Sequence, residues 1–110
     1  GPVIEVDPSG AWFRGLDDSL VVCDRRPVLR RLVVELAKQR IERPGRPIPG
    51  NELFAAGWPD QRITPASAKN RLKVAVSTLR KMGLGTSIIG DRSGYRIDPR
   101  VPVRFVETPR

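Results

Sequence analysis

Histidine is absent from this 110-residue chain, and cysteine and methionine occur once each. Without histidine the chain has no Cys/His zinc site and no histidine-based nucleophilic dyad, and a single cysteine cannot form a disulfide within the chain. That cysteine, Cys23, ends the apolar run Leu20-Val21-Val22, so we expect it to pack as a small hydrophobic side chain. An unpaired cysteine is also typical of a reducing cytoplasm, where we place the protein.

Long apolar runs and catalytic constellations are lacking as well. No run approaches the roughly 18 apolar residues of a membrane span, and no signal-peptide pattern opens the sequence. The carboxylate pair Asp17-Asp18 lies in a predicted turn without the basic or apolar setting that would give the two groups different roles. Gly83-Leu84-Gly85 lacks the remaining glycine of a dinucleotide-binding loop. We therefore expect no enzymatic activity, no cofactor and no metal site.

Length and composition predict one domain with a modest core. Gly1-Pro2 resembles the remnant of a cleaved purification tag, in which case the rest comes from a longer protein. We expect residues 3–100 to form the domain. Residues 101–110 are expected to be a loosely packed or disordered tail, because Pro102 and Pro109 interrupt its apolar residues.

Positive charge is concentrated in one part of the chain. Residues 62–100 hold nine basic and two acidic side chains, a net +7 of the chain's +8. The basic residues are Arg62, Lys69, Arg71, Lys73, Arg80, Lys81, Arg92, Arg96 and Arg100, and the acidic ones are Asp91 and Asp98. Such a surplus on a compact unit indicates a polyanionic partner, and we expect double-stranded DNA. A solvated basic face without a partner is the alternative.

The N-terminal part alternates short apolar runs with turns rich in Asp, Pro and Gly, which predicts an antiparallel meander. The expected strands are residues 3–6, 11–13 and 20–23. Asp24 then offers an N-cap and Pro27 suits a first helical turn. An i, i+3, i+4 apolar stripe continues this helix to near Arg40.

Two further helices are expected after a rigid Pro/Gly loop at residues 44–50. Asn51 can cap a short helix over 52–56, whose Leu53 and Phe54, with Trp58 after it, should pack in the core.

Thr64-Pro65 is the best helix start in the sequence, because a capping hydroxyl precedes a proline at the first helical position. The helix should span about 64–82 and stop at Gly83. Its apolar side is Ala68, Leu72, Ala75, Val76 and Leu79, and the opposite side is Ser67, Asn70, Lys73, Val74, Ser77 and Lys81. Residues 86–98 then predict a hairpin around a loop at 90–94.

This order resembles the winged helix-turn-helix effector domain of OmpR/PhoB-type response regulators over residues 11–98. The resemblance lies in residues 52–58, 77–81 and 93–96, the last being similar to the family's Gly-x-Gly-Tyr-Arg motif with Arg92 in place of the first glycine. It implies an α+β fold with N-terminal antiparallel strands, three helices and a C-terminal β-hairpin wing. It also implies the DNA-binding output domain of a larger bacterial transcription regulator, with the third helix in the major groove.

The chain departs from the family's pattern at three places. Asp24-Arg25-Arg26-Pro27 stands where the first helix usually opens with Leu-Thr-x-x-Glu. Ser77-Thr78 stands where an arginine pair is frequent, and Asn70 where an arginine is common. These differences affect the expected DNA contacts more than the expected fold.

The predicted DNA contacts divide by chemistry. Asn70 can pair with an adenine edge and Val74 can touch a thymine methyl group. Arg92 at the hairpin tip suits a narrow A·T minor groove. The residues expected to contact DNA, most of them through phosphates, are Ser67, Asn70, Arg71, Lys73, Val74, Ser77, Lys81, Arg92 and Arg96. For each, the alternative is an ordinary solvated side chain.

Two rival functions stay open. A winged helix can serve as a protein-protein interaction module without DNA binding, because fold alone does not fix function. RNA binding is less favoured, since aromatic residues make up 5% of the chain and offer no evident stacking platform. The expected further partners are RNA polymerase or other regulatory domains of the same protein, with oligomerisation on DNA.

Overall fold

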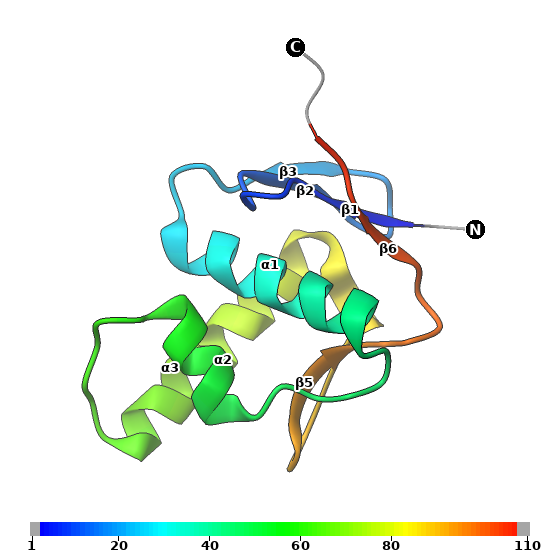
Figure 1. Ribbon diagram of the computed structural model, residues 1–110. Coiled ribbons are helices and arrows are strands. Elements are labelled where there is room, and N and C mark those ends of the chain that lie inside the picture. Colours follow the sequence, from blue (N-terminus) through cyan, green and yellow to red (C-terminus); the bar gives the residue numbers. More distant parts are fainter. Residues whose placement is uncertain (1–2, 108–110) are drawn as a thin grey trace.

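A sheet and a helical layer enclose one core. The computed structural model describes residues 3–107, so the suspected tag remnant Gly1-Pro2 and residues 108–110 lie outside the described part. The helices are α1 (Pro27–Glu42), α2 (Gly50–Gly57) and α3 (Pro65–Leu79). The sheet lies on one side of α1, whereas α2, α3 and a β-hairpin lie on the other (Figure 1). The predicted α+β class with N-terminal antiparallel strands, three helices and a C-terminal hairpin is confirmed, and it is compatible with a winged helix.

The sheet has four strands, one more than the sequence predicted. Its strands, in the order β3-β2-β1-β6, are β3 (Leu20–Val22), β2 (Trp12–Arg14), β1 (Ile4–Val6) and β6 (Val103–Phe105). β6 pairs in parallel with β1, so the segment expected to be a loose tail is ordered as far as the structure describes it. Arg40 contributes to this order by donating to the carbonyl oxygens of Pro99, at 2.8 Å, and Val101, at 3.0 Å.

Four aspartates close turns next to the strands. The carboxylates of Asp7, Asp17, Asp91 and Asp98 each accept a backbone N–H from the residue two positions on, at 2.8–3.1 Å. Such side-chain bonds replace the backbone bonds that a turn leaves unmade. The bonds from the backbone N–H groups of Ser19 and Ser93 lower the pKa of Asp17 and Asp91 below their ordinary value.

Two predicted helix caps were wrong. Asp24 lies ahead of the cap position of α1, which Arg26 occupies without a side-chain bond. Asn51 does not cap α2 but lies within its first turn. The helix begins at Gly50 after the cap residue Pro49, because the N–H of Leu53 already donates to the Pro49 carbonyl at 3.0 Å.

The core joins both layers. It contains Ile4, Val6 and Phe13 from the sheet, Leu32, Val33 and Leu36 from α1, and Leu72, Val76 and Leu79 from α3. Cys23 is fully buried among them, as predicted, and this burial raises the pKa of its thiol.

Among residues 3–107, no helix combines the length and the apolar character that a membrane span requires.

The end of α3 is docked on the turn between β2 and β3. The helix continues into one wide turn, η1 (Arg80–Leu84), in which Gly83 leaves helical geometry with a φ of 142°. A short 3-10 turn, η2 (Gly85–Ser87), leads into the hairpin. The Gly83 carbonyl accepts the N–H of Leu16 at 3.0 Å, and a Cβ on Gly15 would lie 2.4 Å from that same oxygen. This close approach fixes α3 relative to the sheet.

Candidate nucleic-acid interface

The sequence of α3 dictates one buried and one exposed face. Thr64 caps the helix as predicted, since its hydroxyl oxygen accepts the N–H of Ser67 at 3.2 Å. Leu72, Val76 and Leu79 are buried. At about 100° per residue, Asn70 lies nearly opposite this stripe. The helix therefore presents a free polar face on the outside of the domain.

Most of the predicted contact residues share this outer surface. Those exposed on or just beyond α3 are Ser67, Asn70, Arg71, Lys73, Val74 and Lys81. Ser77 is half-buried, and Arg92 is exposed at the tip of the hairpin. Val74 keeps 59% of its surface exposed, so an apolar side chain lies within the polar face.

The charge on α3 is not neutralised within the domain. Its sequence contains no acidic residue. Within residues 3–107, none of the cations Lys69, Arg71, Lys73 and Lys81 forms an ion pair. Unpaired exposed cations leave a local positive potential that attracts polyanions.

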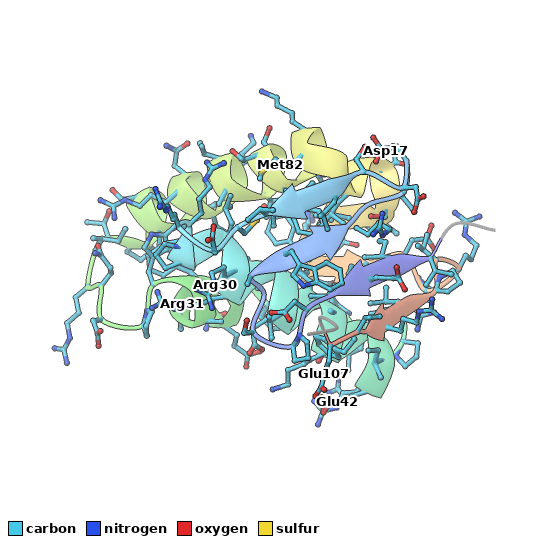
Figure 2. All side chains as sticks on the ribbon, turned by 90° about the horizontal axis from the view of Figure 1, so that it is seen from above. Asp17, Arg30, Arg31, Glu42, Met82 and Glu107 are labelled. Atoms are coloured by element: carbon cyan, nitrogen blue, oxygen red, sulfur yellow. The ribbon has the colours of Figure 1, made fainter. Side chains whose placement is uncertain are left out.

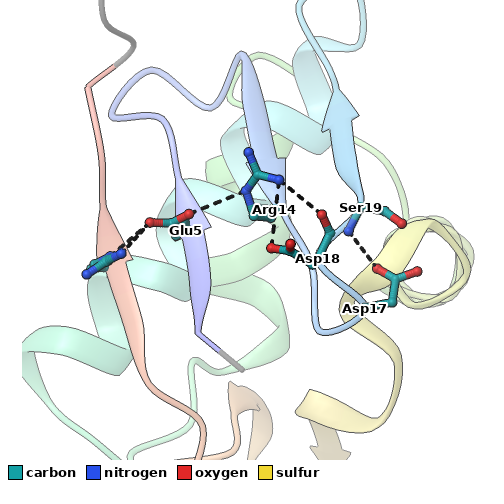
Figure 3. Close-up of polar contacts among 6 residues, drawn as sticks. Glu5, Arg14, Asp17, Asp18 and Ser19 are labelled. Carbon is teal, nitrogen blue, oxygen red and sulfur yellow. Dashed lines mark hydrogen bonds and ion pairs between the residues drawn. The ribbon is translucent and has the colours of Figure 1, made fainter. Parts of the chain in front are cut away.

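On the outer face of the sheet, by contrast, the cations are paired with carboxylates (Figure 3). Glu5 on β1 binds Arg104 at 2.7 Å on one side and Arg14 at 3.4 Å on the other. Arg14 also lies 3.7 Å from Asp18. Anions therefore neutralise the cations of this face, and the net positive charge of the domain is carried elsewhere.

The hairpin is tighter than predicted. Its strands are β4 (Ile88–Asp91) and β5 (Gly94–Ile97), so the loop contains only Arg92 and Ser93 instead of residues 90–94. The turn is short because the Asp91 carboxylate accepts the Ser93 N–H, while Gly94 adopts a φ of 129° that other residues rarely take. Arg92 is thus held at the very end of the hairpin.

Hydrogen bonds fix the hairpin to the end of α3 and to the loop before α2. The guanidinium of Arg80 donates to the Ile88 carbonyl at 2.9 Å and 3.3 Å. At the other strand, Ile48 and Tyr95 exchange two backbone hydrogen bonds of 2.7 Å and 3.0 Å. Tyr95 is partly buried and packs against the core, which anchors the hairpin there.

Arg96 differs from the other predicted contact residues. Its guanidinium lies 3.1 Å from the Asp91 carboxylate, and only 25% of its side chain is exposed. This pairing within the hairpin compensates its charge. Among the predicted residues, Arg96 therefore has the least charge free for a ligand.

Sequence reasoning missed two arginines of this surface. A groove of about 530 Å³ separates the start of α1 from α3. Its lining residues are Arg25, Arg26, Pro27, Val28, Leu29, Trp58, Asn70, Arg71, Val74, Ala75 and Thr78. Arg25 and Arg26 lie outside the basic segment of the sequence, and only the crossing of α1 over α3 brings them beside it.

A second groove, of about 630 Å³, lies between α2, the first half of α3 and the hairpin. Lys69 and Arg92 are on its walls with Tyr95. The two grooves thus flank α3, one toward the hairpin and one toward α1.

Comparison of the chain with protein-family models, curated proteins and solved structures finds no match. The resemblance to OmpR/PhoB-type effector domains stays a prediction.

Proposed function

We propose that this domain binds double-stranded DNA as the output module of a bacterial transcription regulator. In this proposal α3 enters the major groove and the hairpin reaches the adjacent minor groove, as in winged helix-turn-helix proteins. The observation that carries it is the outer face of α3, which has unpaired cations and no acidic side chain. A helix with its side chains is about 10–12 Å wide and fits the major groove.

The proposed mechanism separates affinity from specificity. Arg71, Lys73 and Lys81 contact phosphates, which position the domain without distinguishing sequences. Asn70 offers a donor and an acceptor together, which match an adenine edge, and Val74 adds an apolar contact to a thymine methyl group. Arg92, at the end of the tight hairpin, suits the negative potential of a narrow minor groove.

A salt series tests the proposal. The affinity of the chain for mixed-sequence duplex DNA is measured by fluorescence anisotropy between 50 and 300 mM salt (about a sixfold range). We expect log affinity to fall linearly with log salt at a slope equivalent to about four to six phosphate contacts. A flat dependence, or no binding at low salt, would refute DNA binding.

One observation favours a second candidate, a protein-interaction module. Val74 exposes 59% of its surface at the centre of the α3 face, and an exposed apolar side chain there suits a protein partner as well as a thymine methyl group. Absence of DNA binding in the salt series, with the domain folded, would favour this candidate.

A further inference from the structure

The groove between α1 and α3 has a cationic rim and an apolar floor. Arg25, Arg26 and Arg71 supply the cations, and no acidic residue lines it. Apolar side chains form much of the remaining surface, and two of them, Leu29 and Ala75, are buried. A sugar-phosphate strand has the matching chemistry, since its deoxyribose rings are largely apolar and its phosphates are anionic.

The charges on the rim are held but not neutralised. Arg26 Nη1 donates to Met82 Sδ at 3.7 Å, near the end of α3 where Figure 2 labels Met82. Arg71 Nη1 donates to Gln61 Oε1 at 3.0 Å. Both acceptors are uncharged, and within residues 3–107 none of the three arginines forms an ion pair. Each arginine therefore keeps its full charge for a ligand.

The groove and the hairpin flank opposite sides of the exposed α3 face. Counted at about 100° per residue, Arg71 and Thr78 lie about 80–100° to one side of Asn70, and Arg80 lies about 80° to the other. Arg80 contacts the hairpin, whereas Arg71 and Thr78 line the groove. A major groove likewise has one phosphate strand along each side.

We propose that Arg25 and Arg26 form a second phosphate anchor, on the DNA strand across the major groove from the strand beside the hairpin. This inference rests on the proposed DNA binding. Asn70 and Val74 belong both to the exposed α3 face and to the groove, so a duplex docked on that face lies directly over the rim. This continuity favours DNA over an acidic protein segment as the occupant.

The experiment compares how steeply log affinity for duplex DNA falls with log salt in matched variants of the whole chain. Arg25→Gln/Arg26→Gln removes two charges at the groove. Arg43→Gln/Arg46→Gln removes two from exposed arginines beyond the opposite end of α1. Each lost phosphate contact lowers the slope by about 0.9, so the groove variant should lose about 1.8 and bind about 30-fold more weakly at 0.15 M salt. The control variant should keep the wild-type slope.

Phosphate-ethylation interference, measured on a duplex that contains the preferred site, localises the phosphates that the anchor contacts. The groove variant should lose interference at phosphates on one strand only and keep it at the phosphates beside the hairpin. Thermal unfolding of both variants should match wild type, because the substituted side chains are exposed.

The outcomes separate the two proposals. Wild-type binding with equal slopes for the groove variant and its control would overturn the anchor and leave DNA binding intact. If the groove variant kept its DNA slope but lost binding to poly-glutamate, the groove would belong to an acidic protein partner, which also overturns the anchor. Absence of wild-type DNA binding would overturn both proposals.

Discussion

Replacing Gly94 by alanine should detach the hairpin from the loop before α2. A Cβ built on Gly94 lies 1.9 Å from the Ile48 carbonyl oxygen and 2.6 Å from its carbon, so the strand and the loop must separate. The contact at risk is the pair of backbone hydrogen bonds between Ile48 and Tyr95, at 2.7 Å and 3.0 Å. Losing both costs about 2 kcal/mol, and a β-carbon at a φ of 129° adds about 1–2 kcal/mol.

Urea unfolding followed by tryptophan fluorescence measures this effect. We expect Gly94→Ala to lower the free energy of unfolding by about 3–4 kcal/mol. Gly45→Ala is the matched control, because Gly45 also has a positive φ, of 84°, yet its nearest neighbour to a built Cβ is 3.8 Å away. The control should lose only the backbone-conformation cost, about 1–2 kcal/mol. Equal losses in the two variants would refute the argument that close approach to Ile48 demands glycine here.

Two further predictions concern base contact and pH. Asn70→Ala should weaken binding to the preferred site by about 1–3 kcal/mol and relax the preference at one base pair, whereas Lys81→Ala should weaken binding to all sequences alike. Selection of binding sites from a random pool distinguishes the two variants. An unchanged motif for Asn70→Ala would exclude its contact with a base. The pKa of Asp91 lies below 3.8, first because its carboxylate accepts the Ser93 N–H and then because it accepts a hydrogen bond from the Arg96 side chain. The contribution of Asp91 to stability is therefore complete above its unfolded-state pKa, and it disappears as the pH falls through the lower folded-state pKa. An NMR titration midpoint of Asp91 at or above 3.8 would contradict this.

Local signals in the sequence predicted α3 well. Thr64 and Pro65 mark its start by backbone chemistry alone, and the cap bond to Ser67 is present. The 3.6-residue periodicity placed Leu72 and Val76 in the core and Asn70 outside it. Each of these features depends on residues within a few positions of one another, so the sequence contains all the necessary information.

Features that depend on distant partners were not predictable in this way. β6 has three residues and follows Pro102, so its apolar pattern is too short to indicate a strand, and it exists because β1 offers a parallel edge. The tight hairpin depends on the Asp91 side chain, which accepts the Ser93 N–H. In the sequence, Gly90 and Gly94 on either side of this turn indicate a longer loop. Arg25 and Arg26 are not predictable as neighbours of α3, because their position beside it depends on how α1 crosses it.

The pairing of cations limits how steep the salt dependence can be. Among residues 3–107, the arginines that form ion pairs are Arg14, Arg96, Arg100 and Arg104. Four of the cations proposed to contact DNA are exposed and form no ion pair within the described part of the chain: Arg71, Lys73, Lys81 and Arg92. These four alone predict a slope of about −3.6, and adding Arg25 and Arg26 brings it to about −5.4. The wild-type slope therefore bears on the second anchor before any variant is made, because a value near −3.6 leaves no phosphate contact for Arg25 and Arg26.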